Sequence, residues 1–585
     1  MAHEQDVIGQ LFEKGVLVHK DFLDKLIQEP LLDRLGAEAD ILVLNSDYAE
    51  VLSQSSSLVD WYELDKFRVE AEKERDDDLY QHHLREFQTS SLHLVTQSEP
   101  RELSNLEVEL QTDSTATFLT EHASLQAASL QNTSLQDTSL QELSPTSALH
   151  QTQDDAALTK IIFSPSSVNI LVSYHNIPKK YEVKDFTTFF ITRYQYLEKI
   201  LRNRSELQDI LTINRVLAKS EKEKVSVIGV VSEINQTKAG NLMVTLEDLT
   251  GQIKIIITKS KAELFQSAQD LVVDEVIGIS GMSQDKIMFA DSIVWPDIPI
   301  QAELKKKEEG EEEYAIFLSD IHVGSALFLQ EEFDRFLQWI NGKVGNPEQR
   351  DIANKVKYIF MVGDLVDGVG IYPSQESELK IKDIIKQYSE FTGLVSQIPS
   401  TKQIIMCPGN HDAVHIAEPQ PVLYKELVGN LLLLPNVTLV TNPAMVNIAK
   451  TDTFSGFDVL MYHGYSFDYY VANVESIRNG GGYQRADLIM KFLLKRRHLA
   501  PSFKSTPYFP GHSEDPLLIK RIPDFFVTGH IHYSSVANYK GVTMISCSCW
   551  QGKTTFQEKL GHKPEPARLP IVNLRTREIK VLRFG

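Results

Sequence analysis

The sequence predicts a multidomain protein whose C-terminal part, residues 314–585, is a layered α/β domain. From Tyr314 onward, apolar runs of strand length alternate with helical patterns, as in layered α/β folds. Five shorter strand-like runs, typical of a small β-barrel, precede them between Lys224 and Pro296. With 585 residues the chain is too long for one compact core, so roughly two to four domains are expected.

The N-terminal region divides into a predicted helical module, residues 1–75, and a predicted disordered tether, residues 76–158. Apolar side chains in the module recur at helical spacing, at Val7, Leu11, Phe12, Val16, Phe22, Leu26 and Ile27. We interpret it as a docking or packing module. In the tether, the triplet Ser-Leu-Gln starts at positions 124, 129, 134 and 139. Such a polar repeat buries too little apolar surface to offset its ordering entropy.

Residues 159–304 are predicted to form an OB-type barrel with a preceding helix. A strong helical pattern covers the end of residues 184–207, and a helix-like segment separates the third from the fourth of the five strand-like runs. Barrels of this type bind single-stranded nucleic acid or dock proteins. No aromatic platform distinguishes the two functions here, so both stay open.

Composition narrows the class of protein. The 59 basic and 80 acidic residues give a formal charge of −21, which argues against a basic coat on nucleic acid but leaves room for a local basic groove. Cysteine occurs three times, too rarely for a disulfide framework, and we interpret these residues as buried and structural. The sequence shows no signal peptide and no membrane-spanning run, so a soluble cytoplasmic protein is expected.

Polar residues follow five of the strand-like runs in residues 314–585, where each strand is expected to end. These residues are Asp320, His322, Asp364, Asn410, His411, Asp412, His463, His530 and His532. A single histidine or Gly-Asp pair at such a place is usually a turn or core residue. Five strand ends carrying such residues indicate one site at the rim of the sheet, because α/β folds build their sites there.

The residue types indicate a pair of divalent metal ions. Imidazole and carboxylate suit manganese, iron, zinc or nickel, and an asparagine oxygen adds a neutral ligand. Two ions about 3.5–4 Å apart need a bridging carboxylate, for which Asp364 is the candidate. Manganese is the favoured ion, with iron, zinc, nickel or magnesium as alternatives.

The C-terminal domain resembles the calcineurin-like metallophosphoesterases over about residues 314–560. Five blocks carry the resemblance: Asp320-Ile321-His322, Gly363-Asp364, Gly409-Asn410-His411-Asp412, His463-Gly464 and Gly529-His530-Ile531-His532. The stretches FLSDIHVGS, GDLVDGVGIYP, LLKRRHLAP, PDFFVTGHIH and CWQGKTTFQEKLG also resemble the small subunits of archaeal family D DNA polymerases. No ligand position of the superfamily pattern is missing.

The resemblance implies a role for each residue of the site. Asp320, His322, Asp364 and His532 would hold the first metal. Asp364, Asn410, His463 and His530 would hold the second. His411 would be the general acid that protonates the leaving 3′ oxygen, and Asp367 resembles the carboxylate that orients it, with a turn-capping aspartate as the alternative.

The same resemblance implies a function in DNA replication. The chain would be a 3′→5′ exonuclease, the proofreading subunit of an archaeal DNA polymerase, acting on single-stranded or mismatched DNA 3′ ends. Its partner would be the large polymerising subunit, in a heterodimer or larger assembly associated with the nucleoid, and no membrane is involved. A structural accessory subunit with a little-used metal site and a free-standing phosphoesterase are the alternatives.

A basic run in the C-terminal domain is a candidate nucleic-acid contact. Lys495, Arg496 and Arg497 fall in a helical pattern, which we expect near the cleft or the partner subunit. A solvated helix face is the alternative.

Overall fold

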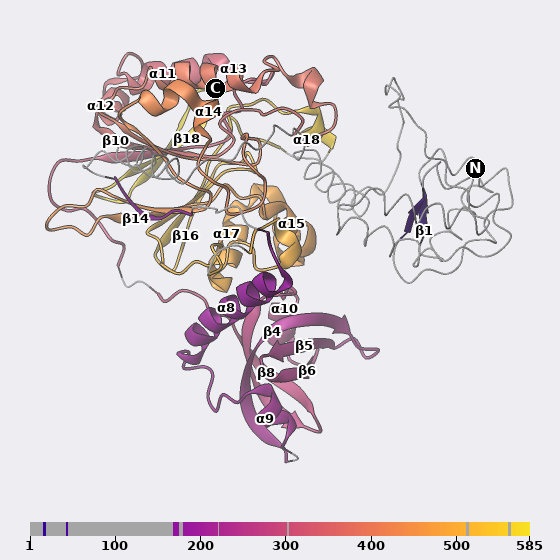
Figure 1. Ribbon diagram of the computed structural model, residues 1–585. Coiled ribbons are helices and arrows are strands. Elements are labelled where there is room, and N and C mark those ends of the chain that lie inside the picture. The colour runs from indigo at the N-terminus through magenta and orange to yellow at the C-terminus, as the bar shows by residue number, and fades with distance from the viewer. Residues whose placement is uncertain are drawn as a thin grey trace, which may run out of the picture. The chain divides into compact units, whose positions relative to one another are not determined.

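The computed structural model describes residues 16–18, 42–44, 168–174, 180–219, 221–300, 303–510, 514–559 and 563–585 (Figure 1). The chain divides into two compact units, Met1–Leu140 and Gln141–Gly585. In the first unit, β1 (Val16–Val18) pairs in parallel with β2 (Leu42–Leu44). Val16, which the periodicity assigns to a helix, is thus extended, as the two β-branched valines of the run Val-Leu-Val favour. The remainder of the predicted helical module and all of the predicted tether lie outside the described residues.

Two six-stranded sheets form the centre of the C-terminal domain (Figure 1). The first sheet has the order β12-β11-β10-β9-β18-β19, and the second β16-β17-β15-β14-β13-β3. The first comprises β9 (Tyr314–Leu318), β10 (Val356–Val362), β11 (Gln403–Cys407), β12 (Val437–Leu439), β18 (Arg568–Asn573) and β19 (Ile579–Arg583). The second comprises β3 (Val168–Val172), β13 (Ala444–Ile448), β14 (Phe457–Met461), β15 (Phe525–Thr528), β16 (Ser535–Tyr539) and β17 (Val542–Ser546).

The central strands are continuous apolar runs because both of their faces are covered. In β9, Phe317 points into the core between the two sheets, whereas Ile316 and Leu318 point to the outer helices. Neighbouring strands keep this register, since Phe317 lies opposite Phe360 of β10 and their rings stack at 5.2 Å. Parallel strands that are buried on both faces have such continuous apolar sequences.

Helices cover the outer face of each sheet (Figure 1). The first sheet is covered by α11 (Gln330–Ile340), α12 (Pro347–Lys355), α13 (Ile384–Val395), α14 (Lys425–Val428) and the 3₁₀ turn η3 (Gly429–Leu433). Against the second pack α15 (Phe467–Asn473), α16 (Glu475–Asn479) and α17 (Ala486–Arg496). Short elements complete the domain: η2 (Gln375–Glu378), η4 (Gly482–Gln484), η5 (Phe503–Ser505) and α18 (Thr555–Lys559). The layers are therefore helix, sheet, sheet, helix, as the strand and helix alternation predicts.

Local signals explain where these helices begin. Asn346 caps α12: its side chain accepts a hydrogen bond from the Gln349 amide, and the Gln349 side chain accepts one from the Asn346 amide. Pro347 occupies the first turn, where its missing N–H leaves no helical bond unmade. Asp383 caps α13 through the Lys386 amide.

The segment before this domain folds into a closed five-stranded barrel, which confirms the predicted strands. The strands are β4 (Glu223–Gln236), β5 (Leu242–Asp248), β6 (Gly251–Ile257), β7 (Val276–Gln284) and β8 (Ile287–Val294), in the order β4-β5-β6-β8-β7. The predicted helix between the third and fourth strands is α10 (Ala262–Ala268). The long helix α8 (Val183–Arg202) and the short α9 (Ile213–Leu217) precede the barrel.

One strand crosses the expected domain boundary. β3 lies before the barrel in sequence, yet it pairs antiparallel with β13 at the edge of the second sheet. Ile170 pairs with Val446, and both contribute to the core between the sheets. The C-terminal domain is thus completed by residues that precede the barrel.

The predicted nucleic-acid contact is wrong for Arg496 and Arg497, because both side chains are buried. The Arg496 guanidinium pairs with the buried Glu275 of the barrel, Nε to Oε2 at 2.7 Å. Arg497 donates to the backbone oxygens of Ile519 and Lys520, at 2.7 and 2.8 Å. Lys495 is half-buried with its Nζ 3.5 Å from the centroid of the Trp295 ring. The run therefore joins the barrel to the C-terminal domain.

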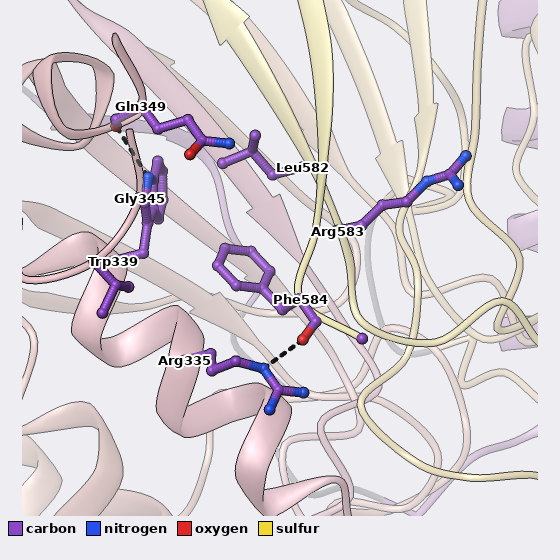
Figure 2. A pocket seen from close by; sticks show the side chains of 9 residues that line it. Arg335, Trp339, Gly345, Gln349, Leu582, Arg583 and Phe584 are labelled. Carbon is purple, nitrogen blue, oxygen red and sulfur yellow. Dashed lines mark hydrogen bonds between the residues drawn. The ribbon is translucent and has the colours of Figure 1, made fainter. Parts of the chain in front are cut away.

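A small cavity of about 190 Å³ lies between α11 and the last strand (Figure 2). Arg335 Nε donates to the Phe584 backbone oxygen at 2.6 Å, and Trp339 Nε1 donates to that of Gln349 at 3.0 Å. None of the predicted site residues lines it. Among the described residues, no helix combines the length and the apolar character needed to cross a membrane.

Candidate metal centre

The predicted site residues follow strands from both sheets. Asp320 and His322 come after β9, Asp364 after β10, and Asn410 and His411 after β11. From the second sheet, His463 comes after β14, and His530 and His532 after β15. β9, β10 and β11 are parallel neighbours, as are β14 and β15. Their carboxyl ends therefore meet at one edge, as expected for a site in an α/β fold.

One group of nitrogen and oxygen atoms is formed by Asp320, His322 and His532. Their ligand atoms lie within 4.8 Å of one another, and all three side chains are buried. The Nε2 atoms of the two histidines are 3.1 Å apart, and that of His532 lies 3.3 Å from Asp320 Oδ1. Two imidazole nitrogens and a carboxylate oxygen thus face one point.

A second group shares Asp320 and adds Asp364 and His463. The His463 Nε2 lies 3.3 Å from Asp364 Oδ2 and 3.0 Å from the Asn410 side-chain oxygen. Asp364 Oδ2 is also 3.8 Å from His322 Nε2, in the first group. Asp364 therefore lies between the two groups, where a bridging carboxylate would have to be.

The backbone is strained at these residues. Asp320, His322, Asp364, His530 and His532 all have positive φ, between 51° and 72°. Residues other than glycine rarely adopt this backbone conformation, which costs roughly 1–3 kcal/mol per residue and is found mainly at functional sites. Five such residues at one sheet edge indicate that the fold maintains this arrangement of side chains at the expense of stability.

Two glycines allow the close approach of neighbouring loops. A Cβ at Gly409 would lie 2.2 Å from Asp364 Oδ1, and one at Gly363 would lie 2.3 Å from His463 Nδ1. Gly363 also has φ +81°, which glycine alone adopts without strain. Both positions therefore require glycine for Asp364 and His463 to come together.

Charge in the site calls for a cationic partner. Burial raises the pKa of Asp364, but the nearby His463 and His411 lower it more, and the net pKa is well below the ordinary value. Burial lowers the pKa of His463 while Asp364 raises it, to about 9. The carboxylates are thus ionised inside the protein, where each negative charge needs a partner of opposite sign. Divalent cations would satisfy them, so the residues present fit metal ions.

His411 lies beside these groups and is half-buried. Its Nδ1 is 2.7 Å from the backbone oxygen of Asp367, which makes Nδ1 the donor and leaves Nε2 for other chemistry. Its ring meets that of His322 edge to face, with centroids 4.6 Å apart. His411, His322 and Asp367 also form a group that could itself hold an ion.

The predicted role of the Asp367 carboxylate needs correction. Its Oδ1 lies 3.0 Å from His322 Nδ1 but 3.9 Å from His411 Nδ1. Gln551 and Gln375 each donate a hydrogen bond to the carboxylate, at 2.9 and 3.1 Å. The carboxylate therefore orients His322, and the main-chain oxygen of Asp367 orients His411. The sequence spacing places Asp367 near both histidines, but it does not show which of them the side chain faces and which the backbone oxygen faces.

Several polar contacts around the centre were not predicted. Asp468 contacts His530 Nε2 at 3.0 Å, and Gln557 contacts His532 Nδ1 at 2.9 Å. Asp412 accepts hydrogen bonds from the amides of Gly409 and Leu365, and its burial raises its pKa to about 7. Gln557 belongs to a stretch already noted for its resemblance, but neither it nor Asp468 follows a strand.

Comparison with known proteins identifies the family of the C-terminal domain and relatives of the chain. Residues 315–534 match the family model described as calcineurin-like phosphoesterase. The chain is 37% identical to the DNA polymerase II small subunit of Methanothermobacter thermautotrophicus, over 67% of this chain and 78% of that protein. It is 38% identical to the DNA polymerase II small subunit of Archaeoglobus fulgidus, over 66% of this chain and 75% of that protein. It is 36% identical to the small subunit of Pyrococcus furiosus, over 69% of this chain and 64% of that protein.

Proposed function

The chain belongs to the family of DNA polymerase II small subunits, and we propose that it is a metal-dependent 3′→5′ exonuclease. Its calcineurin-like phosphoesterase domain implies divalent metal binding and hydrolase chemistry. Its partner would be the large subunit of an archaeal DNA polymerase, and its substrate a single-stranded or mismatched DNA 3′ end. The observation that carries the proposal is the convergence of five predicted ligands, Asp320, His322, Asp364, His463 and His532, on one buried edge.

We assign the ligands as two sets that share Asp364. Asp320, His322, Asp364 and His532 would hold one ion. Asp364, Asn410, His463 and His530 would hold the other. A pair of divalent ions, for which manganese is favoured, supplies a water of lowered pKa and neutralises charge on the phosphate.

The protein's own general acid would be His411. Hydrolysis adds the oxygen of water to phosphorus and breaks the bond to the 3′ oxygen of the preceding nucleotide, which then needs a proton. Because His411 Nδ1 is held by the Asp367 backbone oxygen, Nε2 is the nitrogen that can deliver it. Residues 408–412 carry both Asn410 and His411, so the ligand loop also positions the acid.

A structural accessory role is the second candidate, and it is compatible with the first. The names of the relatives favour it, and the barrel is joined to the phosphoesterase domain by the buried Arg496–Glu275 pair. We propose that residues 159–304, as an OB-type domain, dock DNA or the large subunit.

The test compares His411→Ala and Asp364→Asn with the unmodified chain. Each protein is purified, loaded with Mn²⁺ and incubated with DNA labelled at a single-stranded or mismatched 3′ end. His411→Ala should keep its metal and lose about 10²-fold or more in rate, whereas Asp364→Asn should lose metal and activity together. Capture of the large subunit should be unchanged in both.

The outcomes separate the candidate functions. An unmodified chain that binds metal and the large subunit but leaves DNA intact would favour the accessory role. Cleavage of a generic phosphatase substrate with no cleavage of DNA would indicate a free-standing phosphoesterase. Loss of metal from His411→Ala would make His411 a ligand and overturn the assignment of the acid.

A further inference from the structure

We propose that Asp468 is a positioning residue of the metal centre, which holds His530 so that its Nδ1 is left to bind the second ion. This inference rests on the proposed metal assignment above. His530 Nε2 lies 3.0 Å from Asp468 Oδ2. A nitrogen that donates its proton to a carboxylate has no lone pair for a metal, so the ligand nitrogen of His530 must be Nδ1.

The other three histidines of the centre use the opposite nitrogen. His463 Nδ1 lies 2.9 Å from the Val362 backbone oxygen, and His322 Nδ1 lies 3.0 Å from Asp367. His532 Nε2 lies 3.1 Å from His322 Nε2 and 3.3 Å from Asp320 Oδ1. In all three, Nε2 is the atom that faces the group of ligands. His530 is reversed, and Asp468 is the contact that reverses it.

The backbone of His530 is already tied to the centre. Its amide donates to both carboxylate oxygens of Asp320, at 3.1 and 3.0 Å, and its φ is +72°. The main chain therefore fixes where the side chain starts, and the ring still has to be turned. The contact with Asp468 sets that rotation, since it involves the far end of the ring.

Asp468 is itself held in place by the helical segment between β14 and β15. It lies in the first turn of α15, where the helix end favours a negative charge. The Tyr483 hydroxyl, from η4, donates a hydrogen bond to the Asp468 carboxylate. Burial raises the pKa of Tyr483, and the negative charge of Asp468 raises it further. Tyr483, Asp468 and His530 thus form a chain of contacts from the helical segment to the centre.

Exposure makes the proposal testable without unfolding the protein. The Asp468 side chain is 49% exposed, so it is not a core residue. As an ordinary surface ion pair it would contribute little to stability and would not affect metal binding. As a partner of a ligand it should change metal affinity about 10–100-fold.

The experiment measures Mn²⁺ binding to the full chain by calorimetry after removal of bound metal with a chelator. The variants are Asp468→Ala, Asp468→Asn and the control Asp487→Ala. Asp487 is a carboxylate of the same helical segment, paired with Arg485 at 2.8 Å and part of none of the groups that could hold an ion. Circular dichroism of the metal-free proteins checks that each is folded.

We expect Asp468→Ala to bind one Mn²⁺ as the unmodified chain does and the other about 10–100-fold more weakly. Asp468→Asn should recover part of this loss, because the amide oxygen still accepts from Nε2. Asp487→Ala should bind both ions normally. The proposal would be overturned if Asp468→Ala bound both ions as tightly as the unmodified chain does. It would also be overturned if Asp487→Ala lost as much Mn²⁺ affinity as Asp468→Ala.

Failure of the proposed function has a different signature. A chain that binds two Mn²⁺ and leaves DNA intact, yet loses one ion in Asp468→Ala, is no exonuclease but keeps the positioning role. A chain that binds no Mn²⁺ overturns the positioning role together with the metal assignment.

Discussion

Replacing Arg496 with methionine should destabilise the protein by about 3–5 kcal/mol, the cost of removing one partner from a buried ion pair. The side chains of Arg496 and Glu275 are 2% and 1% exposed, so water screens neither charge. The guanidinium also lies over the rings of Phe492 and Trp295, with Cζ 3.2 and 5.8 Å from their centroids, so methionine removes these cation–π contacts together with the ion pair and the loss is mainly one of charge. Glu275 would retain two donors, the Val272 amide and the Trp295 indole, at 2.8 and 2.9 Å.

The loss should depend on pH, and its sign follows from Glu275. Burial raises the pKa of this carboxyl and Arg496 lowers it, with a net rise. Without Arg496 the pKa rises further, so the folded variant holds a proton that the unfolded chain releases. Its stability is therefore highest below the unfolded pKa of the carboxyl and falls as pH rises above it. The deficit of Arg496→Met should be larger at pH 8 than at pH 5.

Urea unfolding followed by circular dichroism measures the effect. Arg485→Met, which removes an exposed ion pair with Asp487, is the control and should cost no more than about 1 kcal/mol. The double variant Arg496→Met/Glu275→Leu should be more stable than Arg496→Met alone, because no charge is left buried. A single variant as stable as the control, or one equally affected at both pH values, would refute the reasoning.

Three further predictions concern the metals, the tether and a second buried carboxyl. Elemental analysis should find two Mn²⁺ per purified chain, and removal of both with a chelator should abolish nuclease activity; a single ion at full activity would rule out the two-metal assignment. Deleting residues 90–150 should leave the nuclease rate within a few-fold, because a tether of the kind predicted there would contribute only a chain-closure entropy that depends weakly on length; a loss like that of Asp364→Asn would show that this segment takes part. Burial raises the pKa of Glu418 to about 8 from 4.5, so the melting temperature should fall as pH rises from about 5 to 8. Glu418→Gln should reduce that fall, and an unchanged pH profile would mean that Glu418 is ionised in the folded protein.

Strand ends explain why much of the site could be predicted from sequence. A buried parallel strand is an apolar run, so a polar residue directly after it marks a sheet edge. This rule located Asp320, Asp364 and His463, which come from different strands of two sheets. The barrel strands were predictable for a related reason, since glycine-containing turns separate their apolar runs.

Other features depend on packing that no local pattern records. A run such as Lys495–Arg497 is typical of a solvated helix, and only the position of Glu275 on another domain makes Arg496 a buried residue. Asp468 lies in the short helix α15, and its contact with His530 exists because this helix meets the loop after β15 in space. Pairing of β3 with β13 is equally invisible, because the barrel separates the two strands in sequence.

That pairing has a consequence for how the protein is made. During synthesis β3 leaves the ribosome before the barrel, whereas β13 follows only after the barrel and β9, β10, β11 and β12 have been translated. Long-range pairing of this kind closes late, and until then β13 has an open edge available to other chains. A fragment beginning at Tyr314 would keep that edge permanently open. We expect such a fragment to aggregate, and adding residues 168–172 as a separate peptide to restore its solubility.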